Sequence, residues 1–185
     1  SMEYISHSQT LVLVINNTTP VYGGFLTGIA LNNPGGVITG ITLAASNLNF
    51  VLIGGPNFND AVNVAPYGYF DFGASLTNSW LGSGNPSGGI PANGSATFSF
   101  KVSGDLAGLT TDSFAIPLGG DAQRIVPVIA RFRGMSNGES DKVPGTIDEI
   151  QDPLQHAPEP ATYTMIAAGL AAVAISRRFN VSERK

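Results

Sequence analysis

The first candidate for chemistry is the run GMSNG at residues 134–138, which matches the pattern G-x-S-x-G. In serine hydrolases this pattern places a nucleophilic serine on a sharp turn between a strand and a helix. A strand is expected before the run, but residues 139–145 cannot begin the required helix. The two histidines, His7 and His156, lie near the start of the chain and in a late linker. The run therefore indicates a surface turn rich in Gly and Asn.

Acidic residues are the second candidate. Glycoside hydrolysis requires two carboxyl groups that face one cleft, but glutamates are confined to the start of the chain and to its later loop, linker and tail. Single aspartates near strand ends and turns usually accept hydrogen bonds from the backbone. The aspartates of this kind are Asp60, Asp71, Asp105, Asp112 and Asp121. We therefore predict that the protein is not an enzyme.

A structural calcium ion is left open. Calcium binds carboxylate and carbonyl oxygens, and two sets of residues offer such ligands. The first set is Asn57, Asn59 and Asp60, and the second is Asp105 and Asp112. Neither set has the spacing of an EF-hand, so we assign no cofactor and no metal ligand.

Aromatic residues in the middle of the chain are candidates for sugar binding. Alternation along a strand places Tyr67 and Tyr69 on one side and Phe70 and Phe72 on the other. The two tyrosines could form a stacking platform with Trp80, as in a carbohydrate-binding module. The simpler interpretation buries the phenylalanines and leaves the tyrosines on a half-exposed face, and both interpretations remain open.

The composition favours an exported β-rich protein. Of 185 residues, 43% are hydrophobic and only 12% are charged, with 23 Gly, 12 Pro and no Cys. Residues 1–160 hold five Lys or Arg against twelve Asp or Glu, whereas residues 161–185 hold four against one. An acidic body without a basic stripe excludes nucleic-acid binding through phosphate contacts.

Short apolar runs separated by turn residues predict an all-β fold. The expected strands are residues 10–15, 25–31, 37–43, 48–53, 67–76, 95–102 and 124–133. Their spacing predicts an antiparallel β-sandwich of the Ig-like or jelly-roll type. Pro127 predicts that its strand lies at a sheet edge or carries a bulge. Helical turns are expected only at residues 105–109 and 111–114.

Changes in composition divide the chain into four parts. We expect residues 1–9 to be a disordered start or a cloning remnant, and residues 10–145 to form the exported β-sandwich domain. Residues 146–157 are expected to be a flexible acidic linker, and residues 158–185 a separate C-terminal element. Because residues 1–9 contain no basic and apolar leader, we predict a precursor that begins upstream.

The C-terminal element has three parts in a fixed order. Pro158, Glu159 and Pro160 precede the apolar residues 161–176, and a basic pair, Arg177 and Arg178, follows. As an α-helix the apolar segment would be about 24 Å long, against a hydrocarbon core of about 30 Å. The basic pair would keep the C-terminus in the cytoplasm. We therefore predict a short transmembrane helix with an extended segment before it.

This ordered trio resembles the PEP-CTERM protein-sorting signal that exosortases recognise in Gram-negative bacteria. Residues 85–89, 95–100, 130–134 and 140–145 are also similar to ectodomains of PEP-CTERM proteins. The resemblance implies export, a transient stay in the inner membrane, and exosortase cleavage near Pro158–Pro160. It also implies a final place at the cell surface or outside the cell, in an exopolysaccharide or biofilm matrix. The alternative is an uncut membrane anchor.

Overall fold

The computed structural model describes residues 1–18, 23–82, 84–115 and 126–145. The chain separates into two units, Ser1–Ile150 and Gln151–Lys185. All described residues belong to the first unit. The expected linker, apolar helix and basic tail lie outside the described residues.

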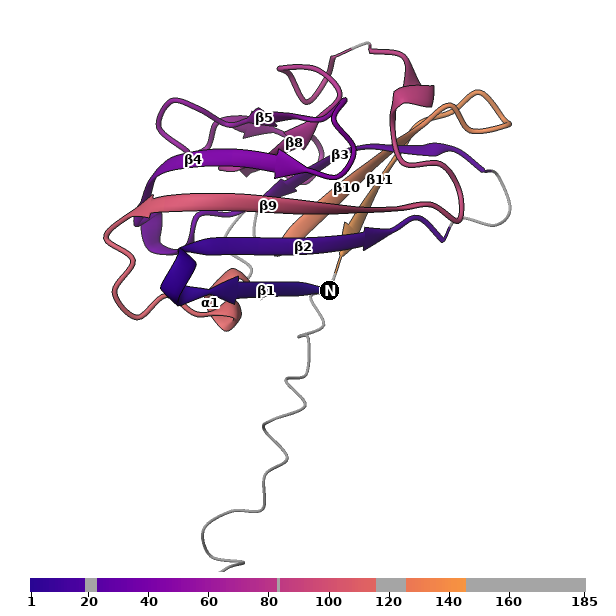
Figure 1. The fold of residues 1–185 in the computed structure, drawn as a ribbon. Helices are drawn as coiled ribbons and strands as arrows, with labels where there is room; N and C mark the ends of the chain where they lie inside the picture. The colour runs from indigo at the N-terminus through magenta and orange to yellow at the C-terminus, as the bar shows by residue number, and fades with distance from the viewer. Residues whose placement is uncertain (19–22, 83, 116–125, 146–185) are drawn as a thin grey trace, which may run out of the picture. The chain divides into compact units, whose positions relative to one another are not determined.

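The described residues are mostly β-strands with a few short helical turns (Figure 1). The strands are β1 (Met2–Ile5), β2 (Thr10–Asn16), β3 (Phe25–Leu31), β4 (Ile38–Ala45), β5 (Val51–Ile53), β6 (Val62–Asn63), β7 (Tyr69–Phe70), β8 (Phe72–Ser75), β9 (Ser95–Gly104), β10 (Val128–Arg133) and β11 (Asp141–Gly145). The helical turns are η1 (Ser6–Ser8), η2 (Pro34–Gly36), η3 (Pro86–Gly88) and α1 (Thr111–Ala115). Of the two expected helical turns, the one over residues 111–114 is therefore present as α1.

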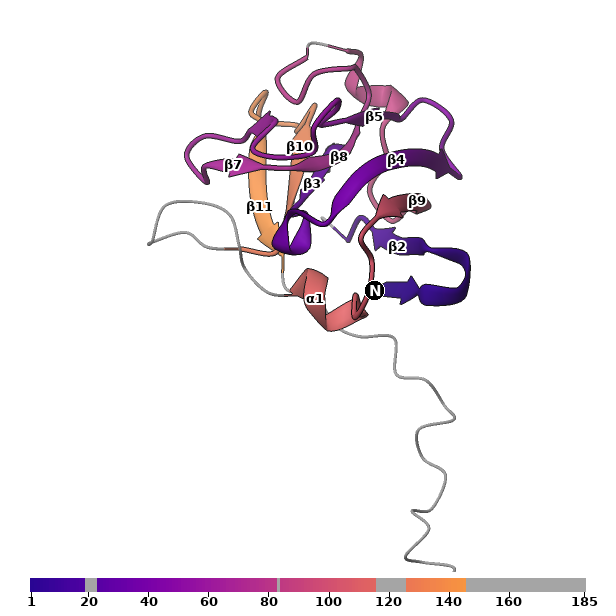
Figure 2. The same cartoon turned by 90° about the vertical axis from the view of Figure 1, so that its left-hand side faces the viewer.

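The strands form two larger sheets and one small one. The first sheet has the order β1-β2-β9-β4, the second has the order β11-β10-β3-β8-β5, and β6 pairs with β7. Every pairing between these strands is antiparallel. Figure 2 shows β2, β9 and β4 in one layer and β11, β10 and β3 in the other. The prediction of an all-β antiparallel fold is confirmed, and the Ig-like or jelly-roll type stays a prediction.

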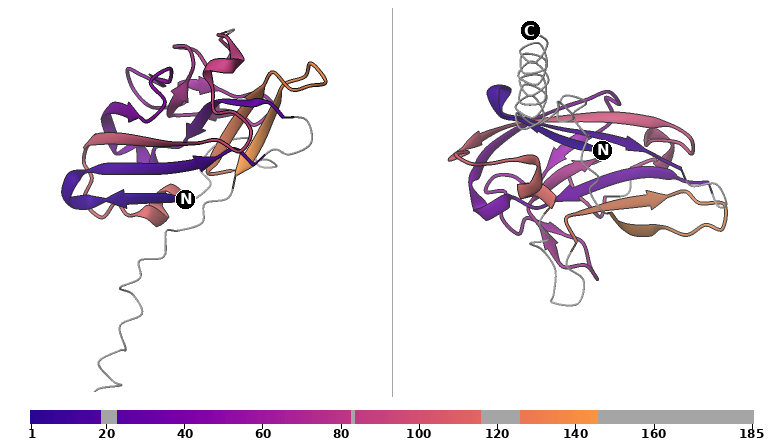
Figure 3. Two further views of the ribbon diagram at one scale, coloured as in Figure 1. Left: turned by 45° about the vertical axis from the view of Figure 1, so that its right-hand side comes forward. Right: turned by 90° about the horizontal axis from the view of Figure 1, so that it is seen from below.

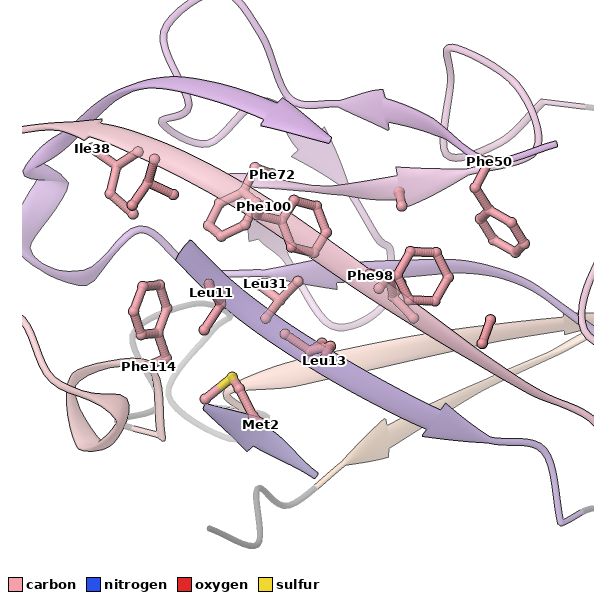
Figure 4. Packing of buried hydrophobic residues seen from close by; sticks show 14 of the residues in the cluster. Met2, Leu11, Leu13, Leu31, Ile38, Phe50, Phe72, Phe98, Phe100 and Phe114 are labelled. Carbon is pink, nitrogen blue, oxygen red and sulfur yellow. The ribbon is translucent and has the colours of Figure 1, made fainter. Parts of the chain in front are cut away.

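One core lies between the two larger sheets. Alternate residues of β9 from Ala96 to Val102 are buried, as the period of two along a strand requires. Phe100 of β9 meets Phe72 of β8 edge to face, with ring centroids 5.4 Å apart. Figure 4 shows these rings among the aliphatic side chains of the cluster. Because both sheets supply side chains, this core joins the two layers.

A second, smaller core covers the other face of the sheet that contains β3. Its buried members are Ala30, Ile53, Val62, Val64, Phe70, Trp80 and Ile129. Both faces of β3 are therefore covered, which explains why all its residues from Leu26 to Leu31 are buried. A strand that is covered on both faces reads as a continuous apolar run rather than an alternating one.

The expected single strand over residues 67–76 is divided at Asp71. β7 ends at Phe70 and pairs with β6, whereas β8 begins at Phe72 and pairs with β3 and β5. Phe70 therefore lies in the smaller core and Phe72 in the larger one. Alternation alone placed both phenylalanines on one face, and the break at Asp71 changes that.

Two expectations for the ends of the domain differ from the structure. Residues 1–9, expected to be disordered, form β1 and η1, and the Met2 side chain is 2% exposed. Met2 packs in the larger core because β1 pairs with β2 along its length. Residues 141–145, for which no strand was expected, form β11 beside β10 (Figure 3).

Pro127 does not mark an edge strand. β10 lies between β11 and β3 and begins at Val128, one residue after the proline. Pro127 has no N–H to donate, and its place just outside the ladder avoids a missing hydrogen bond. The register irregularity of β10 lies instead between Arg131 and Phe132, in its pairing with β3.

Candidate functional site

The three aromatic residues considered above as a sugar-stacking platform do not share one exposed surface. Tyr69 is 52% exposed, whereas Trp80 is 4% exposed and lies in the smaller core. The Tyr67 hydroxyl donates a hydrogen bond to the Lys142 carbonyl over 3.4 Å. A buried indole cannot offer its ring face to a sugar, so a stacking platform that includes Trp80 does not form.

The Trp80 ring packs against the backbone of β3. A Cβ atom placed on Gly28 would lie 3.1 Å from Cζ3 of Trp80, so the absence of a side chain at Gly28 permits this close approach. The Trp80 Nε1 atom is buried and has no hydrogen-bond partner among the residues that the structure describes. An unsatisfied buried N–H is costly in a protein interior.

A hollow of about 280 Å³ lies beside Trp80. Its described lining includes Asn63, Asn78, Ser79 and the backbone of Gly54 and Gly55. The polar side chains of this lining carry amide, hydroxyl and indole groups, the others are apolar, and none of the described lining residues is charged. Such groups can donate to and accept from a neutral polar ligand.

A second hollow, of about 410 Å³, also has Leu81 in its lining. Its described lining includes Tyr67, Leu81, Arg131 and Lys142. The Lys142 Nζ atom donates to the Ala65 carbonyl. The sequence offered no sign of a hollow at Arg131 and Lys142, because the pairing of β10 with β11 that brings them together is not visible in either run.

Arg131 and Arg133 hold the segment that follows Trp80. Arg131 donates to the carbonyls of Trp80 and Gly82, and Arg133 donates to those of Gly82, at 3.2 Å, and Gly84, at 2.8 Å. Burial, and secondly the charge of Arg133, lower the pKa of Arg131 below its usual value. These arginines therefore act as structural donors.

The carboxylate of Asp71 also serves the backbone. Its Oδ2 accepts the Asn33 N–H at 2.6 Å, and its Oδ1 accepts the Asp60 N–H at 2.7 Å. Asp60, a member of the first set of oxygen donors considered above for calcium, thus lies beside Asp71 through its backbone. Among the described residues, no group of three or more His, Asp or Glu side chains is placed to hold a metal ion.

The G-x-S-x-G run lies in the connection between β10 and β11. Gly138 N–H bonds to the Met135 carbonyl, and a strand rather than a helix follows. A nucleophile elbow needs a helix at this point. The expectation of a surface turn at residues 134–138 is therefore confirmed.

The described residues thus define an antiparallel β domain. No helix within them is long and apolar enough to cross a membrane. The tripeptide Pro158–Pro160, the apolar segment 161–176 and the pair Arg177 and Arg178 lie outside the described residues.

Comparison with known proteins identifies this C-terminal element. A family model of the PEP-CTERM protein-sorting motif matches residues 156–178. The resemblance drawn from the tripeptide, the apolar segment and the basic pair is confirmed. The motif implies an exported protein that an exosortase sorts in a Gram-negative bacterium. No curated protein and no solved structure was found to match the chain.

Proposed function

We propose that this chain is a non-enzymatic protein of the cell envelope or extracellular matrix, delivered and cleaved by an exosortase. The observation that carries the proposal is the sorting motif at residues 156–178, placed after a folded β domain. The β domain is the part that is delivered, and the C-terminal element is the sorting signal that directs it.

The residue types of the C-terminal element support export, retention in the membrane and then cleavage. Pro158 and Pro160 disfavour helix around Glu159, so the tripeptide would be an extended strand that a protease can bind. Residues 161–176 would hold the precursor in the inner membrane, and because a helix of about 24 Å is shorter than the hydrocarbon core of about 30 Å, the bilayer would thin locally around it. Arg177 and Arg178 would keep the tail in the cytoplasm. Cleavage near the tripeptide would then release the domain.

The mature mass tests the proposal. The precursor, supplied with an export signal, is expressed in a host with and without an exosortase, and the protein is recovered for intact mass measurement. We expect a C-terminus near Pro158–Pro160 only in the host with the enzyme. Pro158→Ala/Glu159→Ala should keep residues 161–185. If the wild-type chain also keeps these residues in both hosts, it is an uncut anchored protein.

A role in an exopolysaccharide or biofilm matrix is part of this proposal. It rests on the resemblance to PEP-CTERM proteins and on a body with few charges. Deletion of the gene region for this chain should weaken matrix cohesion while secretion of the polysaccharide continues. Unchanged cohesion would remove the matrix role and leave the sorting proposal intact.

A carbohydrate-binding module is the second candidate function. One observation favours it: the uncharged hollow beside Trp80 has the side chains of Asn63, Asn78 and Ser79 in its described lining. A sugar hydroxyl could accept hydrogen bonds from the two side-chain amides. A glycan array with Asn78→Ala and Trp80→Phe tests it, with Tyr69→Ala as the surface control. Absence of glycan binding, or binding that ignores Asn78 and Trp80, contradicts this candidate.

A further inference from the structure

The four edge strands of the two larger sheets differ in how they are protected. At β11, the edge carries Asp141, Lys142 and Pro144. The edge at β1 is covered at Tyr4, whose N–H donates to the Thr111 hydroxyl of α1 at 2.9 Å, and β5 is only 3 residues long. Charges, proline, short length and covering groups are the usual protections against strand addition.

The remaining edge, β4, has none of these protections, and its one register irregularity, between Ile38 and Gly40, lies before the regular pairing of residues 41–45. It is 8 residues long, Ile38–Ala45, and contains neither a charged residue nor a proline. Among the described strands it pairs only with β9. Figure 1 shows β4 at the border of its sheet. Leu48, in the loop after β4, is 90% exposed.

The direction of the free backbone groups follows from the register. The Ser46 N–H donates to the Thr97 carbonyl of β9 at 2.8 Å. In an antiparallel strand, the N–H and C=O groups of every second residue point toward the same neighbouring strand. Thr42 and Ala44 therefore face β9, opposite Lys101 and Ser99. The backbone groups of Ile41, Leu43 and Ala45 then point away from the sheet.

We propose that β4 pairs with β4 of a second copy of this chain, antiparallel about a twofold axis at Leu43. Leu43 would face its own symmetry mate and Ile41 would face Ala45, so every outward N–H and C=O would find a partner. A second copy fits because the pattern is self-complementary, as a twofold interface must be. It also fits because β4 brings no like charge to the axis, although the chain as a whole has a net charge of −4.

The expected dimer is weak. One strand pairing buries less than the roughly 800 Å² per partner of a standard interface. The side chains of Ile41, Leu43 and Ala45 already pack on the larger core, so they add little new burial. Dimerisation should therefore depend on concentration in the range from about 10 µM to about 1 mM.

Charge substitutions at the edge test this pairing. The full chain in mild detergent is examined by sedimentation velocity, with Thr42→Lys/Ala44→Lys as the test variant. In the proposed dimer Thr42 lies opposite Ala44 of the second copy, so lysines would oppose lysines and weaken association at least about tenfold. Ser99→Lys is the matched control, because it adds a charge to the same sheet face one strand away from the edge.

An equal mixture of Thr42→Lys/Ala44→Lys with Thr42→Glu/Ala44→Glu should restore association. This rescue separates edge pairing from association through the apolar C-terminal segment, which is identical in all variants.

Disulfide formation tests the register itself. The chain has no Cys, so Thr42→Cys and Ala44→Cys chains can be mixed and oxidised. In the proposed dimer, Thr42 and Ala44 of the second copy form a pair without backbone hydrogen bonds to each other. The Cα atoms of such a pair are about 4.5 Å apart, which lies within disulfide range. We expect the mixture to cross-link faster than either variant alone. A chain that is monomeric up to about 1 mM, or association that the lysine pair leaves unchanged, would overturn the proposal.

Discussion

Asp71 and Asn33 are joined by a short hydrogen bond, 2.6 Å from the Asn33 backbone nitrogen to Oδ2 of Asp71. The other carboxylate oxygen accepts the Asp60 N–H at 2.7 Å. The side-chain amide of Asn33 in turn donates to the carbonyls of Ile38 and Phe58. One carboxylate and one amide thus connect the end of β3, the start of β4 and the loop before β6.

We expect Asp71→Ala to lower the free energy of unfolding by about 2–3 kcal/mol, because two hydrogen bonds to a charged group are lost. Urea denaturation measures the change. Asp105→Ala is the control, since Asp105 is exposed and its carboxylate accepts no hydrogen bond among the described residues. Equal effects of the two substitutions would show that the Asp71 bonds contribute little.

The contact between Trp80 and Gly28 predicts a strong coupling. Gly28→Ala should destabilise the domain by about 1–3 kcal/mol, because the new methyl group meets the indole ring. Trp80→Phe removes the part of the ring that approaches Gly28, so Gly28→Ala should cost less in that background. A double-mutant cycle by urea denaturation should give a coupling of about 0.5–3 kcal/mol. Simple additivity would contradict the contact.

The burial of Met2 predicts that the first strand is part of the stable domain. Met2→Ala should lower the free energy of unfolding by about 2–5 kcal/mol, as for other buried methionines. Glu3→Ala, at an exposed position of the same strand, should change it by less than about 0.5 kcal/mol. If thermal unfolding gives the same transition for both variants, β1 does not contribute to the cooperative unit.

The arginine contacts predict a local effect on the segment after Trp80. Arg131→Leu removes the donors to the Trp80 and Gly82 carbonyls, so this segment should open more easily. Hydrogen exchange of residues 79–82 should become about tenfold faster, which corresponds to about 1.4 kcal/mol. Lys101→Leu, on the exposed face of β9, should leave this exchange unchanged. A global acceleration would instead indicate loss of overall stability.

The sequence predicted the main strands because the alternation or apolar run of each strand reflects whether one or both of its faces are buried. The alternation over residues 95–102 corresponds to β9, and the apolar run over residues 25–31 corresponds to β3. β1 and β11 were not predicted, because Glu3 and the polar residues near Lys142 offer no alternation. Both strands exist through pairing with β2 and β10.

The sequence by itself determined the sorting motif, because its recognition depends on the linear order of a tripeptide, an apolar segment and a basic pair. Only the tertiary structure decided that Trp80 is buried against Gly28 while Tyr69 is exposed. It also decided that β4 is an edge strand and β10 is not. Burial and edge position depend on which distant strands pair and which faces are covered, and no local pattern contains that information.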